Sequence, residues 1–204
     1  MLLCSNDGFQ FDQKIREKFN VNLIAGVDEV GRGCISGPLV AAAVVFDAST
    51  NIPHLKESKS LSSNKRIYFF KQILSSAKFI SYHIVSVEEI NKFGLSKANY
   101  LAMKFAVDKL KIKPQLVIVD GFRNPYIENI KQYNLIRADK KSAVVAAASI
   151  VAKVIRDKIM EIYHVIIPDY DFGNNKGYPT KKHISVISEI GLCEFHRYYA
   201  YKFV

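Results

Sequence analysis

The chain alternates between continuous apolar runs and segments in which apolar residues recur every three or four positions. The run at 38–46 is apolar at nearly every position, which is typical of a strand buried on both faces of a sheet. In 65–76 the residues Ile67, Phe70, Ile73 and Leu74 share one predicted helix face, and 62–64 can cap that helix. The pattern predicts strands at 21–28, 38–46, 78–87, 115–119 and 133–138, and helices at 65–76, 96–110, 142–163 and 181–190.

This order of elements predicts an α/β fold in which helices flank a central sheet of about five strands. The front half of the helix at 142–163 is small and apolar nearly all round, so that helix is expected to be buried. With 204 residues and 49% apolar content, the chain can bury a core of ordinary size, most simply in one domain with a small C-terminal addition.

The charge balance is strongly basic. The sequence has 29 Lys and Arg against 19 Asp and Glu, a net charge of +10. This surplus favours a polyanionic partner, of which nucleic acid is the commonest, although solubility alone explains it about as well.

The cysteines and the apolar runs indicate the cellular compartment of the chain. Cys4, Cys34 and Cys193 are widely spaced and form no C-x-x-C pair, so we expect ordinary reduced cysteines. The first residues lack the basic and apolar regions of a signal peptide, and no apolar run approaches the ~20 residues of a membrane span. We therefore expect a cytoplasmic protein without a membrane contact.

The most informative local feature is a pair of adjacent acids, Asp28 and Glu29, at the end of the apolar stretch 21–27. Neighbouring carboxylates at the end of an apolar strand raise each other's proton affinity unless a cation compensates them. Adjacent side chains on a regular strand point to opposite faces, so the pair can serve one site only if the strand bends or ends there. Gly31 and Gly33 would permit this bend, and Arg32 between them adds a positive charge, which suggests a substrate that carries phosphate.

Two further acids stand at predicted strand ends. Asp120 follows the strand at 115–119, and Asp139 follows the strand at 133–138. In an open α/β sheet such ends are where ligands gather, so both acids could converge with Asp28 and Glu29 on one cleft. Four carboxylates without His or Cys suit Mg²⁺ or Mn²⁺ rather than Zn²⁺. Taken singly, an Asp after a strand is more often a turn former or a helix cap. The five histidines show no zinc-ligand spacing, and Glu57 is expected to be solvated.

Several sequence blocks together resemble the type 2 ribonucleases H, in particular bacterial ribonuclease HII. The opening block is Gly26-Val27-Asp28-Glu29-Val30-Gly31-Arg32-Gly33, followed by Ser36-Gly37-Pro38-Leu39-Val40. The later blocks are Ser58-Lys59-Ser60-Leu61 with Glu57 in the usual Asp place, Val119-Asp120-Gly121, Ala138-Asp139 with the helix that follows, Gly177-Tyr178-Pro179-Thr180, and His196-Arg197. The resemblance spans about residues 24–197 and is highly specific.

The resemblance implies a ribonuclease H-like fold with a mixed central sheet and a small C-terminal helical extension. We expect an N-terminal segment at 1–20, the catalytic domain at 21–166 and a substrate-reading extension at 167–204. The implied metal-binding and catalytic residues are Asp28, Glu29, Asp120 and Asp139. Gly31, Arg32 and Gly33 would contact the ribonucleotide through its 2′-OH, and Tyr178 would stack on the sugar of the next nucleotide.

The implied activity is two-metal hydrolysis, with Mg²⁺ or Mn²⁺, of the RNA strand of RNA/DNA hybrids and of single ribonucleotides embedded in duplex DNA. We expect a monomer, and the resemblance leaves a sliding-clamp contact open. Three alternatives are a ribonuclease HIII-like enzyme, a hybrid-binding protein without activity, and a generic metal nuclease acting on DNA. Asp157 is expected to pair with a nearby Arg or Lys. For Lys153 two positions are equally expected: its side chain reaches the acidic cluster, or it extends to solvent.

Overall fold

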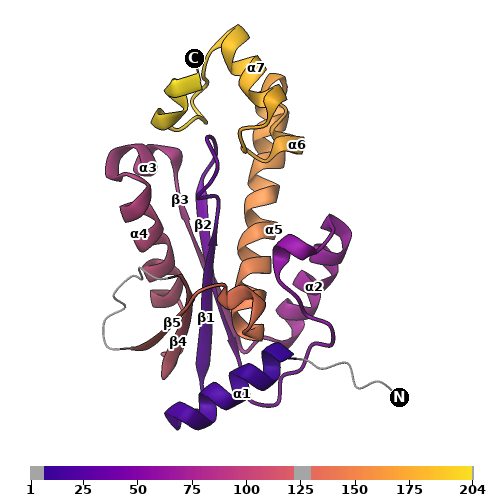
Figure 1. The fold of residues 1–204 in the computed structure, drawn as a ribbon, viewed down its shortest axis with the longest axis vertical. Helices are drawn as coiled ribbons and strands as arrows, with labels where there is room; N and C mark the ends of the chain where they lie inside the picture. The colour runs from indigo at the N-terminus through magenta and orange to yellow at the C-terminus, as the bar shows by residue number, and fades with distance from the viewer. Residues whose placement is uncertain (1–6, 122–129, 204) are drawn as a thin grey trace.

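The computed structural model describes residues 7–121 and 130–203, and it contains the predicted five-stranded mixed sheet (Figure 1). The strand order is β3-β2-β1-β4-β5. β1 pairs antiparallel with β2 and parallel with β4, β2 pairs antiparallel with β3, and β4 pairs parallel with β5. The strands are β1 (Ile24–Val30), β2 (Leu39–Phe46), β3 (Phe79–Val85), β4 (Leu116–Asp120) and β5 (Lys131–Leu135).

Helices cover both faces of this sheet, with α5, α1 and α2 on one side and α3 and α4 on the other (Figure 1). The α-helices are α1 (Asp7–Phe19), α2 (Ser63–Ser76), α3 (Val87–Phe93), α4 (Leu95–Asp108), α5 (Ala143–Ile166), α6 (Phe172–Asn175) and α7 (Lys181–Ile190). Short 3₁₀ helices are η1 (Ser58–Ser60), η2 (Ala138–Lys140), η3 (Pro168–Tyr170) and η4 (Tyr198–Phe203). Ser62 caps α2 as predicted and Thr180 caps α7, each by accepting a hydrogen bond from a backbone N–H of the first turn.

Four sequence-based expectations about these elements are wrong. The strand predicted at 78–87 ends at Val85, because Ser86 opens α3 with a capping box. The strand predicted at 133–138 lies instead at Lys131–Leu135, and the first strand begins at Ile24 rather than at residue 21. On α2 the buried residues are Phe69 and Ile73, whereas Ile67 and Leu74 are exposed.

The central strand β2 is apolar on both faces because each face meets a different helical layer. Val40, Ala42, Val44 and Phe46 belong to the core under α5, and the alternate residues of the strand belong to the core under α4. The small front half of α5 brings its backbone close to β1. A Cβ added at Gly26 would lie 2.4 Å from the carbonyl carbon of Val144.

The beginning of α5 is held by the N-terminal helix α1. The buried Asp12 accepts hydrogen bonds from the Ser142 hydroxyl at 2.6 Å and from the Val144 N–H at 2.9 Å. Burial raises the pKa of Asp12 to about 6, although these hydrogen bonds oppose the shift. Asp12 thus joins α1 to α5 just after η2, where one of the candidate site residues lies.

The C-terminal residues pack at the far end of α5, where α6, α7 and η4 gather (Figure 1). Their small apolar cluster is separate from the two cores of the sheet, and it contains Ile35, Met160, Tyr170, Phe172, Ile187 and Ala200. Cys34 and Cys193 are free thiols, while Cys4 lies outside the described residues. Among the helices described, none combines the length and the apolar character needed to cross a membrane.

Candidate metal centre

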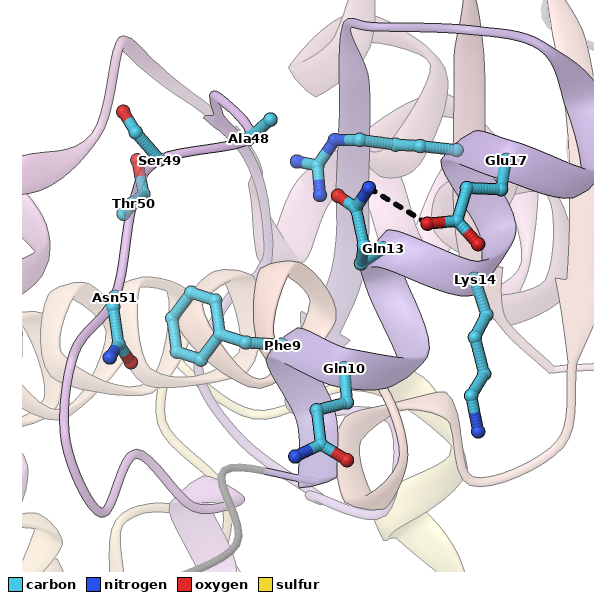
Figure 2. A pocket seen from close by; sticks show the side chains of 10 residues that line it. Phe9, Gln10, Gln13, Lys14, Glu17, Ala48, Ser49, Thr50 and Asn51 are labelled. Atoms are coloured by element: carbon cyan, nitrogen blue, oxygen red, sulfur yellow. Dashed lines mark hydrogen bonds between the residues drawn. The ribbon is translucent and has the colours of Figure 1, made fainter.

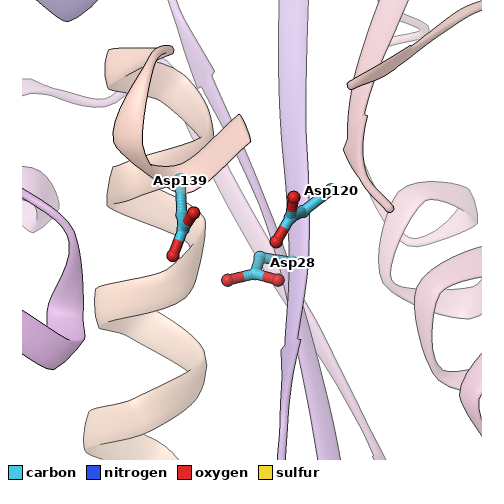
Figure 3. A group of neighbouring side chains, drawn as sticks. All are labelled: Asp28, Asp120 and Asp139. Carbon is cyan, nitrogen blue, oxygen red and sulfur yellow. The ribbon is translucent and has the colours of Figure 1, made fainter. Parts of the chain in front are cut away.

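Three of the four predicted acids meet at one point. One carboxylate oxygen from each of Asp28, Asp120 and Asp139 lies within 4.8 Å of the others (Figure 3). The sheet explains the first two, because β1 and β4 run parallel with Val27 opposite Val119, so the next residue of each strand is an aspartate. The cluster therefore joins two central strands to the segment that precedes α5.

Asp139 reaches the cluster by a different route from the one predicted. It does not follow a strand directly, because β5 ends at Leu135 and Asp139 lies in η2. Arg137 has a left-handed backbone (φ 54°) that turns the chain between these elements. The Ala138 N–H then donates to Asp120 Oδ1 at 2.8 Å, which ties the turn to the end of β4.

The electrostatics of the cluster call for a cation. Burial raises the pKa of Asp28 well above its usual range, and the nearby carboxylates of Glu29, Asp120 and Asp139 raise it further. A hydrogen bond from Ser149 of α5 opposes this shift. The pKa of Asp139 is also raised, first by burial and then by Asp120. Because all the ligand atoms are carboxylate oxygens, the group fits a hard divalent cation such as Mg²⁺ or Mn²⁺.

Glu29 lies beside this group rather than within it. Pairing of β1 with β2 continues to Val30, but its parallel pairing with β4 stops at Val27, one residue before the acid pair. The Glu29 carboxylate faces Arg32, with Oε1 3.4 Å from Nη1. Burial nevertheless raises the pKa of Glu29 to about 7, even though the Arg32 charge lowers it. The Glu29 carboxylate still raises the pKa of Asp28, so the two acids interact although Glu29 lies outside the three-acid cluster.

A fifth acid, Glu57, was not predicted at this site. Its side chain is only 15% exposed, and its Oε1 lies 3.1 Å from Lys140 Nζ, so the expectation of a solvated side chain is wrong. Its carboxylate also contributes to the raised pKa of Asp139. The usable sequence signal was its position, since Glu57 occupies the place of an Asp in the ribonuclease HII block.

The glycine-rich turn after β1 meets the Tyr178 loop, although the two are far apart in the sequence. A Cβ added at Gly33 would lie 3.8 Å from Cε1 of Tyr178, so the ring of Tyr178 passes close to the Gly33 backbone. Gly31 has a φ of 109°, and a Cβ there would lie 2.6 Å from Nε of Arg156. The Arg32 side chain is 62% exposed and the Tyr178 residue 39% exposed, which leaves both accessible to a ligand.

Lys153 of α5 and Arg66 of α2 pair with the same acid. Lys153 Nζ lies 2.6 Å from Asp157 Oδ1, and Arg66 Nη1 lies 3.3 Å from Asp157 Oδ2, which confirms Asp157 as an ion-pair partner. The Lys153 ammonium also lies 5.8 Å from the centre of the Tyr178 ring. Lys153 therefore supports the Tyr178 loop.

A separate pocket of about 750 Å³ lies between α1 and the turn that follows β2 (Figure 2). None of the clustered acids lines it. Gln13 and Glu17 are joined there by a 3.1 Å hydrogen bond, and the Arg16 guanidinium donates to the carbonyl of Phe46 at 3.0 Å. Arg16 therefore holds α1 against the sheet, whereas the bond between Gln13 and Glu17 lies within α1. The pocket is lined by Phe9, Gln10, Gln13, Lys14, Arg16, Glu17, Ala48, Ser49, Thr50 and Asn51.

Comparison with known proteins gives a consistent result. The family model described as Ribonuclease HII matches residues 25–202. A Ribonuclease HII from Endomicrobium trichonymphae is 42% identical over 189 residues, which cover 93% of this chain and 90% of that protein. The crystal structure of a ribonuclease H2 from Pyrococcus horikoshii is similar with a TM-score of 0.74 and 27% identity, covering 89% of this chain and 96% of that one. The RNase HII of a PCNA:RNase HII complex from Archaeoglobus fulgidus is similar with a TM-score of 0.71 and 26% identity, covering 86% and 93%.

Proposed function

The chain belongs to the ribonuclease HII family and is a metal-dependent ribonuclease H, and we propose that it also nicks duplex DNA on the 5′ side of single embedded ribonucleotides. The observation that carries the proposal is the contact between Gly33 and the Tyr178 ring, just beyond the strand that bears Asp28 and Glu29. This arrangement supports a sugar-reading site beside the proposed metal site.

In this proposal Asp28, Glu29, Asp120 and Asp139 hold the divalent ions. Mg²⁺ or Mn²⁺ bound there would activate a water for attack on phosphorus and stabilise the charge that grows on the leaving 3′-oxygen. The donor set supports this assignment, because Asp28, Asp120 and Asp139 converge within 4.8 Å and contribute only oxygen ligands. The products would carry 3′-hydroxyl and 5′-phosphate ends.

The reading of the substrate is assigned to the turn after β1 and to the Tyr178 loop. Backbone groups of Gly31, Arg32 and Gly33 would hydrogen-bond the ribose 2′-OH, which distinguishes RNA from DNA. Two glycines without Cβ atoms allow this close approach. Tyr178 would stack on the sugar of the following nucleotide and so sense the RNA-to-DNA junction. Residues 167–204, which supply Tyr178, would form a substrate-reading extension of the catalytic domain at 21–166.

Two partner assignments belong to the same proposal. The RNase HII in the Archaeoglobus fulgidus structure is bound to PCNA, which makes a sliding clamp a candidate partner of this chain as well. We propose that the chain acts as a monomer. Size-exclusion chromatography of the protein with and without a purified clamp tests both assignments.

The direct test is incubation with a DNA duplex that contains one ribonucleotide, in Mg²⁺ or in Mn²⁺, followed by mapping of the cut. We expect a nick 5′ to the ribonucleotide, and no cut in an all-DNA duplex. A chain that cuts only long hybrids would act as a ribonuclease HIII-like enzyme, and cleavage of the all-DNA duplex would indicate a generic nuclease. A chain that binds hybrids and cuts none would be a binding protein without activity.

The metal assignment has its own test. Asp28→Asn is expected to reduce kcat by about 10³-fold or more while leaving hybrid binding largely intact, because one charge that positions the metal ions is lost. A variant with near wild-type turnover would show that Asp28 is not a metal ligand.

A further inference from the structure

The adjacent residues His196 and Arg197 have no part in the chemistry above, yet each is nearly or fully buried and each is directed to a different substrate-reading segment. The Arg197 guanidinium donates to four backbone carbonyls of the turn after β1. The distances are 2.8 Å to Gly31, 3.0 Å to Cys34, 2.9 Å to Gly37 and 3.1 Å to Pro38. Arg197 therefore fixes both ends of the segment that contains Gly31-Arg32-Gly33.

His196 is linked to the other segment through a second buried histidine. Its Nδ1 faces the Cys193 N–H at 3.0 Å, the Cys193 thiol at 3.2 Å and the Cys193 carbonyl at 3.3 Å, and that carbonyl already accepts from the His196 N–H. We assign Nδ1 as the acceptor of the shortest of these contacts, which puts the proton of the neutral ring on Nε2. That Nε2–H points at Nε2 of His183, 3.0 Å away, which must then accept. The remaining proton of His183 is on Nδ1, which donates to the Tyr178 carbonyl at 2.8 Å. Donors and acceptors thus match at every step from Cys193 to Tyr178.

This chain of hydrogen bonds requires both rings to be neutral, since a second proton on either ring would oppose two N–H groups at 3.0 Å. The surroundings keep them so. Burial lowers the pKa of His183, and burial together with the charge of His183 lowers the pKa of His196 to about 4. The aromatic rings of Tyr170 and Phe172 pack on the pair and supply no charge to it.

Backbone hydrogen bonds also connect the His196-Arg197 dipeptide, the turn after β1 and the Tyr178 loop. The Arg197 N–H donates to the Ile35 carbonyl at 2.9 Å, and the Ile35 N–H donates to the Gly177 carbonyl at 2.9 Å. A Cβ at Gly177 would lie 2.5 Å from the Ser36 carbonyl oxygen, so the two reading segments touch directly. The His196-Arg197 dipeptide lies against this junction and contacts both sides of it.

We propose that His183 and Arg197 are positioning residues that set the spacing between Gly31-Arg32-Gly33 and Tyr178, with His196 fixing which nitrogen of His183 donates to the Tyr178 carbonyl. The inference rests on the proposed function of those two segments. Neither side chain touches the substrate in this scheme. Their effect would fall on the selection of a single embedded ribonucleotide, for which the 2′-OH and the next sugar must both fit at one position.

A purely structural role predicts a different outcome, and two isosteric substitutions separate the roles. In His183→Asn the amide nitrogen takes the place of Nδ1, so the bond to the Tyr178 carbonyl is kept and the bond to His196 is lost. In His183→Gln the amide oxygen takes the place of Nε2, so the bond from His196 is kept and the bond to the Tyr178 carbonyl is lost. If the pair only packs the C-terminal cluster, the two variants should behave alike.

The experiment measures kcat/KM of wild type, His183→Asn, His183→Gln and Arg197→Lys on a duplex with one ribonucleotide and on a fully RNA/DNA hybrid. We expect His183→Gln and Arg197→Lys to lose about tenfold on the single ribonucleotide, the loss typical of one positioning hydrogen bond, and clearly less on the hybrid. The hybrid offers a ribose at every position and so depends less on the spacing. His183→Asn should stay within about twofold of wild type on both substrates.

Ile187→Val is the matched control, because it removes a methylene from the same buried cluster and leaves both hydrogen-bonded contacts in place. It should lower the melting temperature without changing the ratio of the two kcat/KM values. An unchanged ratio in His183→Gln and Arg197→Lys, or equal losses in the two His183 variants, overturns the positioning role. A wild-type protein that does not cut the single ribonucleotide instead overturns the proposed function.

Discussion

Gly26→Ala tests whether the contact between β1 and α5 sets the geometry of the metal centre. The added Cβ would lie 2.4 Å from the Val144 carbonyl carbon and 2.5 Å from both the Val144 oxygen and the Val145 nitrogen. These are backbone atoms, which no rotamer change can move. An ordinary contact begins at 3.4 Å, so α5 must move away from β1 by about 1.0 Å, the difference between the two distances.

Two consequences follow from that displacement. The free energy of unfolding should fall by about 3 kcal/mol, at the upper end of the usual cost of overpacking, because the obstacle is rigid. The helix also carries Ser149, which hydrogen-bonds Asp28, and it begins shortly after Asp139. A misplacement of about 1 Å in a catalytic group can reduce the rate about 10²-fold, so kcat/KM on an RNA/DNA hybrid should fall by that order.

Urea unfolding and steady-state kinetics measure both effects, and the urea midpoint should fall without a change in the slope of the transition. Gly191→Ala is the control, because Gly191 has a φ of 82° but open space around its added Cβ. It should cost about 1–3 kcal/mol from backbone conformation alone, because its ψ of −164° lies in a region that only glycine adopts readily, and it should leave kcat/KM unchanged. If Gly26→Ala changes stability by less than about 0.5 kcal/mol and keeps full activity, close packing of α5 does not set the site.

Two other predictions concern buried carboxylates. In metal-free protein Glu29 keeps its proton up to a pKa of about 7, against 4.5 when unfolded, so its contribution to stability is lost as the pH rises through that window. Urea titrations in chelator should show a loss of about 3 kcal/mol across this window that saturating Mg²⁺ largely removes; identical pH profiles with and without Mg²⁺ would contradict this. Asp12→Ala should lower stability by about 2 kcal/mol, because Ser142 and Val144 lose a buried acceptor at the start of α5. Urea unfolding measures this loss, and an unchanged midpoint would exclude the capping role.

Much of the fold could be predicted because its signals are local. β2 is apolar without interruption, and Ser62 and Thr180 are strong helix caps, so these elements lie where the pattern places them. α3 was missed because only one residue, Ser86, separates it from β3. The buried face of α2 was half right, since Phe70 and Ile73 pack in the core and Ile67 and Leu74 do not. Two faces of that helix carry apolar residues, and only packing against α5 selects between them.

The residues of the site also differ in whether local sequence signals could predict them. Asp28 and Asp120 could be brought together from the sequence because they end neighbouring parallel strands, which is a general rule of α/β sheets. Glu57 could not, since its place depends on a contact between η1 and the turn at Asp139. Arg197 was also beyond prediction: a sequence gives no sign that a guanidinium will be fully buried among backbone carbonyls, because those acceptors belong to a turn distant in the chain.

The arrangement of the site separates the parts that must be rigid from the parts that must be selective. Asp28 and Asp120 belong to central strands, and Ser149 of α5 hydrogen-bonds Asp28, so the proposed metal ligands are as rigid as the core that holds them. The Gly31 turn lies outside the sheet and cannot draw its order from strand pairing. Its carbonyls instead accept hydrogen bonds from a buried guanidinium, whose removal would take one hydrogen bond from each, although the Cys34 and Pro38 carbonyls would keep a second donor in Tyr199 and Arg156. Substitutions in the core should therefore reduce cleavage of every substrate, whereas substitutions around Arg197 should change which substrate is preferred.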